Sequence, residues 1–467
     1  MGARTVTEKD GTAVAPAAEG AGGPGLLLLW SVHEPLFSVL RFPSDHIELG
    51  RDQLLESGVH DARISRRHVR IDVQDRAITV RELGSTNGSF IDGKRLSGQV
   101  SLPLWDPQES RTAHADAARA HVLRVGRTIL IPVADVAPYQ RDGLSVNSSG
   151  WVAGPLLQRV HARTALLARA GENVLLTGPS GVGKELAAQA YHAATGRPQG
   201  PLVAINCATI SRDLAESLLF GARRGAYSGA VADSDGLIVS AHGGTLFLDE
   251  IGELEVSNQA KLLRVLETRE VLAVGATRPR LVDIRLCAAT LTDLDAAVAS
   301  GRFRQDLYFR IGRPSIRIPA LQQRIEEIPT LIDQSLRSVT QRAGNADAAG
   351  SDRAPLQASS ALVEACLLRS WPGNVRELRT EIRAAGLTAV AEGRSEVEVC
   401  HLDAEAGGTR SVELSVEPSS SQISEALQTT GGNLTAAADK LHLPRTTLRR
   451  LLERHGIDLV TFRRSSS

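Results

Sequence analysis

A glycine-rich loop between a short apolar strand and a helical stretch constrains the fold of this chain more than any other feature. Apolar residues 174–176 are followed by Gly-Pro-Ser-Gly-Val-Gly-Lys-Glu over 178–185 and then by a helical pattern. In such a loop, glycines let backbone N–H groups converge on phosphate oxygens, while the helix N-terminus and a lysine supply positive potential. The order strand, loop, helix therefore favours an α/β domain that binds a nucleotide over an ordinary glycine-rich turn. The residues predicted to contact the nucleotide here are Gly178, Ser180, Gly181, Val182, Gly183, Lys184 and Glu185.

A second apolar strand, at 244–248, ends in two carboxylates, Asp249 and Glu250. Beside bound phosphates, Asp249 can hold Mg²⁺, and Glu250 can orient or deprotonate the water that attacks the terminal phosphate. Two acids at a strand end also serve as caps for a following helix. Because this pair follows a phosphate loop in the chain, the sequence favours a catalytic role over a cap.

Four apolar runs alternate with amphipathic segments between residues 151 and 329. The runs lie at 173–176, 202–205, 244–248 and 284–289. This alternation predicts a parallel α/β sheet. A low-complexity insertion at 344–358 precedes two helical patterns, at 360–369 and 374–392, so residues from about 330 to 395 are expected to form a helical lid.

In the N-terminal part, short alternating segments broken by turn residues replace the long helical patterns. These segments lie at 37–42, 46–49, 68–73, 77–82, 90–91 and 129–133. They predict a small all-β domain over residues 24–135. Residues 1–23 are expected to be a disordered lead-in, 106–119 an inserted loop and 136–150 a linker.

The C-terminal residues 422–464 show three short helical patterns, after a linker expected at 405–421. Residues 440–464 carry seven basic and two acidic side chains, and Leu443-Pro444 marks a turn before the last helix. A turn followed by a basic helix is typical of a DNA-binding helix-turn-helix, with a solvated helical hairpin as the alternative. The side chains predicted to face DNA are Arg445, Thr446, Thr447, Arg449 and Arg450.

Composition excludes several other classes of protein. Basic and acidic residues balance at 53 each and hydrophobic residues make up 42%, which excludes a wholly disordered chain. The apolar run at 26–30 is too short to span a bilayer and follows an acidic start, so no membrane partner is expected. Four widely spaced cysteines form neither a metal motif nor a disulfide framework, which suits a cytoplasmic protein.

Residues 151–395 resemble the AAA+ domain of bacterial enhancer-binding proteins, the activators of sigma-54 RNA polymerase. The matching stretches are 178–185, 205–207, 219–221, 225–230, 243–252, 303–310 and 371–378. In that family an acidic residue commonly follows the loop lysine, so Glu185 fits although the general motif has Ser or Thr there. The resemblance implies ATP and Mg²⁺ as cofactors, with Asp249 as the metal ligand.

The same resemblance assigns roles outside the phosphate loop. Asn206 would switch the orientation of Glu250, and Arg376 would sense the terminal phosphate from the lid. Arg304 and Arg310 would reach into a neighbouring subunit's ATP site, where such arginines stabilise transition-state charge. Residues acting between subunits imply a homo-oligomer, from a dimer up to the hexameric ring of the family.

The segment most specific to this family is Gly-Ala-Tyr-Ser-Gly-Ala, which resembles the GAFTGA loop that contacts sigma-54. Tyr and Ser replace Phe and Thr and keep the aromatic ring and the hydroxyl. The residues so assigned are Gly225, Ala226, Tyr227, Ser228, Gly229 and Ala230. Two departures put efficient hydrolysis in question: Leu291 stands where a polar sensor residue is expected, and Gln322 where the family often has Arg. A leucine side chain cannot hydrogen-bond a phosphate or its water.

Residues 25–133 resemble the FHA domain, a β-sandwich that binds phosphothreonine peptides. The resemblance rests on Gly50-Arg51, Ser65-Arg-Arg-His68 and Gly84-Ser-Thr-Asn-Gly88, in that order. A phosphothreonine brings negative charge and acceptor oxygens, which a guanidinium and hydroxyls satisfy. A scaffold domain without a working pocket is the alternative. By the family pattern, the peptide-binding residues are Arg51, Ser65, Arg66, Thr86 and Asn87, while His68 braces the loop.

Residues 422–464 resemble the Fis-like helix-turn-helix of the same activators. The sequence thus predicts a multidomain chain with an all-β FHA sandwich, an α/β AAA+ P-loop domain with a helical lid, and an all-α helix-turn-helix. The favoured function is an ATP-driven activator of sigma-54 polymerase that binds enhancer DNA and receives a phosphothreonine signal. Two alternatives stay open: a sigma-54-independent AAA+ regulator, and a phosphopeptide-switched DNA-binding protein that binds ATP only to assemble, which Leu291 favours.

Overall fold

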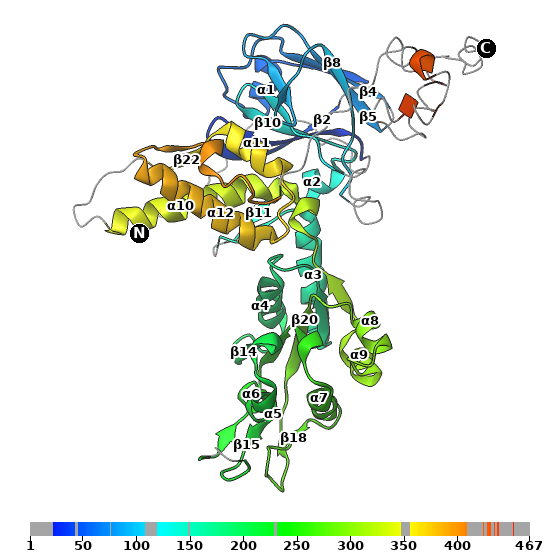
Figure 1. Cartoon of the computed structure of the whole chain (residues 1–467), viewed down its shortest axis with the longest axis vertical. Coiled ribbons are helices and arrows are strands. Elements are labelled where there is room, and N and C mark those ends of the chain that lie inside the picture. Colours follow the sequence, from blue (N-terminus) through cyan, green and yellow to red (C-terminus); the bar gives the residue numbers. More distant parts are fainter. Residues whose placement is uncertain are drawn as a thin grey trace, which may run out of the picture.

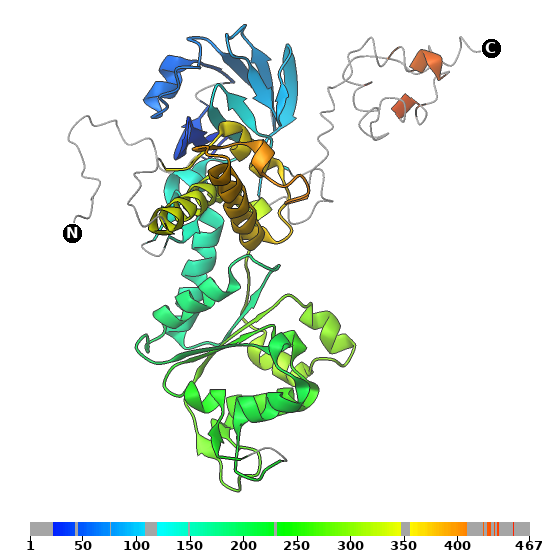
Figure 2. The same cartoon turned by 60° about the vertical axis from the view of Figure 1, so that its left-hand side comes forward.

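The computed structural model of the chain describes residues 22–408, apart from 43–44, 75, 108–118, 148–149, 228–230 and 347–354, and scattered residues between 424 and 452. Three parts follow one another along the long axis: a β-sandwich, a group of lid helices and a parallel α/β sheet (Figure 1). The view turned by 60° shows the same order (Figure 2). The lid comes last of the three in the chain, yet it lies between the other two.

Two antiparallel sheets form the sandwich and confirm the all-β prediction for the N-terminal part. One sheet has the order β2-β1-β10-β9-β6-β7 and the other the order β3-β4-β5-β8. Alternate residues such as Val69 and Ile71 of β4 are buried between the sheets, as a side-chain period of two requires. The elements are β1 (Gly25–Ser31), β2 (Glu34–Arg41), β3 (His46–Leu49), α1 (Arg51–Glu56), β4 (Val69–Gln74), β5 (Ala77–Glu82), β6 (Ser89–Ile91), β7 (Lys94–Arg95), β8 (Gln99–Pro103), β9 (Leu123–Val125) and β10 (Thr128–Val133).

Strand β1 is buried on both faces, which explains its uninterrupted apolar sequence. Leu26 and Leu28 lie in the sandwich core, whereas Leu27 and Leu29 belong to a second apolar cluster that includes the lid. A strand covered on both sides shows no alternation of apolar and polar residues. For that reason the sequence predicted no strand here.

Five parallel strands, in the order β14-β17-β20-β13-β21, form the sheet of the α/β part. The four predicted strands correspond to β13, β14, β17 and β20, and β21 was not predicted. The chain passes from β13 to one edge of the sheet and later returns to its other side, so the carboxyl end of β13 is a switch point where such sheets bind ligands. The elements are β12 (Val152–Ala153), α3 (Pro155–Ala170), β13 (Val174–Thr177), α4 (Lys184–Ala194), β14 (Leu202–Asn206), η2 (Cys207–Thr209), α5 (Arg212–Phe220), α6 (Leu237–Ser240), β17 (Thr245–Asp249), η3 (Ile251–Glu253), α7 (Val256–Thr268), β20 (Arg285–Thr290), α8 (Leu294–Ala299), α9 (Gln305–Ile311) and β21 (Ser315–Arg317).

Two small hairpins project from the α/β part at the end opposite the sandwich, where Figure 1 labels β15 and β18. They pair β15 (Gly221–Ala222) with β16 (Ser234–Asp235), and β18 (Glu270–Val271) with β19 (Arg280–Leu281). A bridge between Ala222 and Val274 joins the two hairpins. The described residues 225–227 of the predicted sigma-54 loop follow β15 in the first hairpin.

The lid confirms the two helical patterns read at 360–369 and 374–392. Its elements are η4 (Leu321–Gln323), η5 (Ile325–Glu327), α10 (Ile328–Ala346), β22 (Gln357–Ala358), α11 (Ser360–Leu368), α12 (Asn374–Ala391), β23 (Glu396–Val397) and η6 (Val399–His401). Helices α10 and α12 pack along each other and share one apolar cluster with the outer face of the sandwich.

The sandwich is docked on the lid by apolar packing and by a buried ion pair. Ile131 of β10 and Ile382 of α12 belong to the same apolar cluster. Arg124 Nε of β9 lies 2.6 Å from a carboxylate oxygen of Glu364 in α11, and the two side chains are only 16% and 4% exposed. The other carboxylate oxygen accepts the Gly93 N–H at 2.9 Å. Breaking such a pair leaves a buried charge uncompensated, so sandwich and lid are expected to move together.

Within the expected linker at 136–150, the described residues 136–147 and 150 include regular secondary structure. They form α2 (Ala137–Asp142) and β11 (Ser145–Val146), and β11 pairs with β12. Val136 and Tyr139 are buried in the cluster shared with the lid. Gly143 and Gly150, two of the residues that indicated a linker, have positive φ and lie beside these short elements.

Several predictions fall on residues that the structure does not describe. These are most of the lead-in at 1–23, of the loop at 106–119 and of the linker at 405–421, much of the insertion at 344–358, and the residues assigned to DNA, Arg445, Thr446, Thr447, Arg449 and Arg450. Within the described part, no helix is both long enough and apolar enough to span a bilayer.

Candidate nucleotide-binding site

The phosphate loop leaves β13 and packs directly against the lid. Lys184 begins α4, as the order strand, loop, helix predicted. Gly181 has φ +71°, and a Cβ there would lie 2.2 Å from the carbonyl oxygen of Gly373. Only glycine permits such a close backbone approach, so this position holds loop and lid together.

A cavity of about 590 Å³ opens between this loop, the ends of β14 and β17, and lid helix α12. Its size suits a small-molecule ligand such as a nucleotide. The predicted residues that line it are Ser180, Gly181, Val182, Gly183, Lys184, Glu185, Asn206, Asp249, Glu250 and Arg376. Gly178 lies behind the lining, where its carbonyl oxygen accepts a hydrogen bond from Lys184 Nζ at 3.2 Å.

Lys184 and Glu250 form an ion pair inside the cavity. Lys184 Nζ lies 3.3 Å from Glu250 Oε1, and both side chains are mostly buried. Glu250 Oε2 accepts the backbone N–H of Leu291 at 2.9 Å. Glu250 also has φ +53°, a conformation that costs about 1–3 kcal/mol for a residue other than glycine and that clusters at functional sites. Both carboxylate oxygens are therefore held in place beside the lysine.

The hydrogen bond from Leu291 to Glu250 changes the interpretation of the leucine that stands where the family has a polar residue. The leucine offers its main-chain N–H to Glu250, and this contact does not depend on the side chain. Asn206 lies beside the other acid, with Nδ2 3.4 Å from Asp249 Oδ2. The Asn206–Glu250 contact implied by the family resemblance is thus not made among the described residues. Gln322 lies outside the cavity and donates to the Ser370 carbonyl at 2.5 Å.

The carboxylate of Asp249 lies in the cavity at the end of β17. Burial, and then the neighbouring Glu250 carboxylate, raise the pKa of Asp249 above its usual value. Asp249 accepts hydrogen bonds from two neutral groups, the Asn206 amide and the Glu250 N–H. Neither donor neutralises the negative charge of the carboxylate, so a bound cation would be stabilised there. Among the described residues there is no cluster of three metal-ligating side chains. A magnesium ion held by one carboxylate together with phosphate oxygens needs no such cluster.

Two residues of lid helix α12, Asn374 and Arg376, contact the phosphate loop. Arg376 Nη1 lies 3.4 Å from Ser180 Oγ of the phosphate loop. Asn374 Nδ2 donates to the Ser180 carbonyl at 2.9 Å, and its Oδ1 accepts the Leu321 N–H at 2.8 Å. Asn374 was not predicted, although it begins α12 within the matched stretch at 371–378.

A buried group of charged residues beneath the loop was missed by the sequence analysis. Arg324 donates to the Val182 carbonyl at 2.7 Å and pairs with Glu327 at 2.6 Å. Glu327 also accepts the Gly154 N–H at 2.8 Å, which ties the start of α3 to the lid. In a chain so rich in arginine, no local pattern marks Arg324. The remaining lining residues that were not predicted are Trp151, Val152, Leu186, Leu291, Leu331, Val375, Arg379, Thr380 and Arg383.

Glu326, next to this group, should make the protein less stable at high pH. Burial, and then the charge of Glu327, raise the pKa of Glu326 to about 8, and neither of its carboxylate oxygens has a hydrogen-bond partner among the described residues. Because the folded-state pKa lies above the unfolded value near 4.5, the free energy of unfolding falls as pH rises from about 4.5 to about 8. The Glu326→Gln variant lacks this penalty. Its melting temperature should exceed that of the wild type at pH 8 and approach it at pH 5; a difference independent of pH would contradict this.

The two predicted finger arginines lie outside the cavity. Arg304 caps the start of α9 and pairs with Asp306 at 2.6 Å, and Arg310 donates to the Leu266 carbonyl at 3.2 Å. Neither lines the nucleotide cavity of its own chain.

The predicted sigma-54 loop is exposed at the tip of the molecule. Tyr227 is 44% exposed, and residues 228–230 lie outside the described part. At the base of the loop, Arg223 Nη1 pairs with Asp233 at 2.7 Å, and its N–H donates to the Val274 carbonyl at 2.9 Å. The contacts of Arg223 thus fix the base of the loop, and the ring of Tyr227 is accessible to solvent.

The predicted peptide-binding residues of the sandwich come together at one edge. Arg51 Nε donates to the Ile64 carbonyl at 2.9 Å, Ser65 Oγ accepts the Thr86 N–H at 3.2 Å, and Asn87 Nδ2 donates to the Arg63 carbonyl at 2.8 Å. Three loops are thereby joined into one exposed surface. Arg66 lies in the middle loop and is exposed.

His68 is structural, as predicted. It is fully buried, and its Nδ1 accepts the Ser65 N–H at 3.0 Å. Nε2 must therefore carry the proton and donate to the Gly88 carbonyl, 3.2 Å away. The imidazole thus ties together the two loops that carry Ser65 and Asn87.

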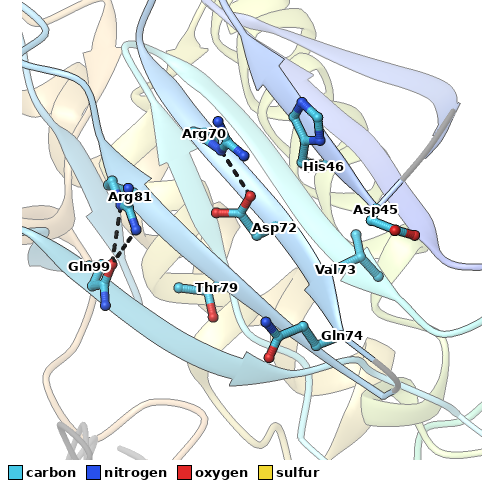
Figure 3. Close-up of a pocket in the computed structure, with 9 residues that line it drawn as sticks. All are labelled: Asp45, His46, Arg70, Asp72, Val73, Gln74, Thr79, Arg81 and Gln99. Carbon is cyan, nitrogen blue, oxygen red and sulfur yellow. Dashed lines mark hydrogen bonds and ion pairs between the residues drawn. The ribbon is translucent and has the colours of Figure 1, made fainter.

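A second hollow lies on the open face of the β3-β4-β5-β8 sheet (Figure 3). Its charged and polar side chains satisfy one another: Arg70 pairs with Asp72 at 2.8 Å, and Arg81 donates to Gln99 at 2.9–3.1 Å. We assign this self-paired polar face no binding role.

Three family models match the chain in the predicted order. The FHA domain matches residues 47–106, the sigma-54 interaction domain residues 152–317, and the bacterial regulatory protein, Fis family, residues 420–455. The last match covers residues that the structure leaves mostly undescribed.

Known proteins resemble the chain over as much as 73% of its length. The transcriptional regulatory protein ZraR of Escherichia coli (strain K12) is 40% identical over 304 residues, which cover 64% of this chain and 67% of ZraR. GlrR of the same strain is 39% identical over 317 residues, 66% of this chain and 68% of GlrR. XylR of Pseudomonas putida is 45% identical over 228 residues, 49% of this chain and 39% of XylR.

A solved structure, NtrX from Brucella abortus, has a TM-score of 0.50 and 29% identity to this protein, covering 65% of this chain and 69% of NtrX. Together with the parallel sheet, the phosphate loop and the family matches, this likeness confirms the predicted fold class. The chain therefore belongs to the sigma-54-dependent transcriptional regulators and carries, in order, an FHA domain, a nucleotide-binding AAA+ sigma-54 interaction domain and a Fis-type helix-turn-helix.

Proposed function

We propose that this protein hydrolyses ATP in a homo-oligomeric ring and uses the energy to open promoters bound by sigma-54 RNA polymerase. The observation that carries the proposal is the convergence of Lys184, Asp249 and Glu250 in one cavity beside the phosphate loop. These are the groups that phosphoryl transfer to water requires.

The position of each residue determines its role in ATP hydrolysis. Lys184 and the loop N–H groups hold the β- and γ-phosphates, and Arg376 reaches them from the lid. Asp249 would hold Mg²⁺, which supplies Lewis-acid stabilisation of phosphate charge. Glu250, fixed by Leu291 N–H, orients the attacking water and takes its proton. Arg304 and Arg310 of a neighbouring subunit would stabilise the charge that develops in the transition state.

The FHA domain would supply the regulatory input. Arg51, Ser65 and Asn87 form an exposed surface suited to a phosphothreonine peptide. From its far side, Arg124 reaches Glu364 of the lid, and the lid in turn contacts the phosphate loop at Ser180. Peptide binding and nucleotide binding therefore act on one connected body. At the C-terminus, Arg445, Arg449 and Arg450 would contact enhancer DNA.

Promoter opening by purified sigma-54 polymerase tests the proposal directly. The Ser228→Ala variant should hydrolyse ATP at a rate close to the wild type but fail to support opening, because it loses only the loop hydroxyl. The Ser234→Ala variant, at the base of the same hairpin, is the matched control and should open the promoter normally. ATP hydrolysis by the wild type without any opening would instead favour the sigma-54-independent regulator.

The route from FHA domain to lid gives a second prediction. Coupling between two ligand sites typically changes affinity by about 5–150-fold. We expect a phosphothreonine peptide to change ATP turnover in the wild type, and Glu364→Gln to reduce that response while peptide affinity stays unchanged. Calorimetry and phosphate release measure the two quantities. The Asp72→Asn variant, which removes a paired carboxylate from the open sheet face, should behave as the wild type; an equal loss of response there would contradict the route through Glu364.

A further inference from the structure

Lid helix α12 presents a row of arginines to the nucleotide cavity. Arg376, Arg379 and Arg383 all line the cavity, and their spacing of three and four residues places them on one face of the helix. Arg376 lies at the end of the row that contacts the phosphate loop, through Ser180. Because a helix rises about 1.5 Å per residue, Arg379 and Arg383 lie about 5 and 10 Å further along it. The row therefore extends past the loop, to where a nucleotide held by its 5′-phosphates would place its ribose and base.

The distal pair of this row, Arg379 and Arg383, lacks the negative partners that buried arginines usually have. Both side chains are partly buried, and within the described part of the chain neither forms an ion pair. Arg379 Nη2 donates to the neutral Gln334 Oε1 at 3.2 Å, whereas the buried Nε of Arg383 has no hydrogen-bond partner there. Burial, and then the charge of Arg383, lower the pKa of Arg379 below its usual value. Two guanidinium groups thus repel each other at the wall of the cavity.

Four acidic side chains also line the cavity, but they do not neutralise the distal pair. Glu250 is paired with Lys184 at 3.3 Å, and Glu327 with Arg324 at 2.6 Å. The other two acids belong to the phosphate loop and to the end of β17, and no ion pair among the described residues joins them to the distal pair. The distal pair therefore favours a ligand that brings negative charge to this part of the cavity.

We propose that Arg379 and Arg383 form a second phosphate subsite, which binds a phosphate carried on the ribose of the nucleotide whose 5′-phosphates the loop holds. ATP has all its phosphates on the 5′ side, so it leaves the distal pair without a counter-charge. A nucleotide phosphorylated at the 5′ position and also at the 2′ or 3′ position satisfies both the loop and the distal pair, because guanidinium groups match phosphate oxygens in bidentate geometry. This inference rests on the nucleotide binding of the proposed function but not on hydrolysis or on a ring. Such a nucleotide would displace ATP, since both need the same loop.

Calorimetry on the full chain tests the subsite with ADP and with two ADP analogues that carry a phosphate at the ribose 2′ or 3′ position. The wild type should bind one of the analogues at least about tenfold more tightly than ADP, because charge-assisted hydrogen bonds add to those at the loop. In Arg379→Gln/Arg383→Gln this ratio of affinities should fall to near one. The matched control is Arg337→Gln/Arg394→Gln, which removes two exposed arginines that have carboxylate partners and lie outside the cavity. It should keep the wild-type ratio.

The wild-type comparison needs no substitution, so it decides the proposal even if a variant fails to fold. Equal binding of ADP and both analogues would overturn the second subsite and leave nucleotide binding standing, whereas no binding of ADP or ATP would overturn both. A preference that survives in Arg379→Gln/Arg383→Gln would assign the ribose phosphate to other residues and overturn the role of the distal pair. Inorganic phosphate added with ADP separates the two sources of a phosphate group. If it raises ADP affinity in the wild type but not in Arg379→Gln/Arg383→Gln, the subsite takes a free anion, and the ribose phosphate is overturned.

Discussion

Replacing Arg304 with alanine is expected to lower ATP turnover by about 10³–10⁵-fold, the range found when arginine fingers are lost. The affinity for ATP should stay close to that of the wild type, because Arg304 does not line the cavity of its own chain. Phosphate release at saturating ATP measures the first effect, and equilibrium binding of a fluorescent nucleotide measures the second. A large loss of affinity with little change in turnover would contradict the assignment.

Mixing variants shows whether the arginine acts between subunits. Lys184→Ala removes nucleotide binding from its own subunit but leaves Arg304 intact, whereas Arg304→Ala does the reverse. In randomly mixed rings, about a quarter of the interfaces combine an intact phosphate loop with an intact neighbouring finger. Activity should therefore reappear on mixing two inactive proteins. If Arg304 acted within its own chain, mixing would restore nothing.

Arg310 serves as an internal comparison for this experiment. Its guanidinium donates to the Leu266 carbonyl of α7, so part of its role is to hold α9 in place. Arg310→Ala should therefore lower the melting temperature as well as turnover. Among the described residues, the Arg304 side chain pairs with the exposed Asp306 of α9, and its removal should leave stability unchanged.

Secondary structure was predictable from the sequence wherever burial of one face makes apolar and polar residues alternate with a regular period. Strands β4 and β5 alternate because one face is buried and the other is exposed, and α12 follows the pattern read at 374–392. Strand β1 escaped prediction because the sandwich core covers Leu28 on one face and the lid covers Leu27 on the other. The helix α2 and the strand β11 were not predicted, because each is too short for a hydrophobic period to be recognised in its sequence.

In the candidate site, too, some residues were predictable from the sequence and others were not. The loop glycines and Lys184 were predicted because phosphate binding restricts residue types over a few consecutive positions. Arg324 was missed because its partner Val182 lies 142 residues away, and nothing local distinguishes it from other arginines. The Arg124–Glu364 pair is separated by 240 residues and joins two domains. Contacts between residues so far apart in the chain depend on how helices, strands and domains pack together. A local sequence pattern does not indicate this packing.

Leu291 shows why a departure from a family pattern need not abolish the chemistry. The sequence places a leucine where a hydrogen-bonding side chain is expected, which favoured a protein that binds ATP without hydrolysing it. The structure gives Glu250 a hydrogen bond from the Leu291 main chain, and any residue except proline would supply it at this position. The argument from Leu291 against hydrolysis is therefore weaker than the sequence alone implied.

Replacing Glu250 with glutamine is the most direct test of hydrolysis. Glutamine keeps the shape and can keep a carbonyl acceptor for the Leu291 N–H, but it cannot take a proton from water. We expect phosphate release to fall by about 10²–10⁴-fold, the usual contribution of a general base. ATP affinity should be maintained or increased, because Lys184 loses its ion-pair partner in the cavity and is left to the phosphates.

The control must remove the same charge nearby without touching the ATP chemistry. Glu253 is an exposed carboxylate three residues further along the chain and does not line the cavity, so Glu253→Gln should release phosphate at the wild-type rate. Equal rates for wild type and Glu250→Gln would eliminate hydrolysis by this site and leave ATP as an assembly ligand. Loss of turnover in Glu250→Gln with retained ATP binding, and unchanged turnover in Glu253→Gln, would instead support Glu250 as the general base of hydrolysis.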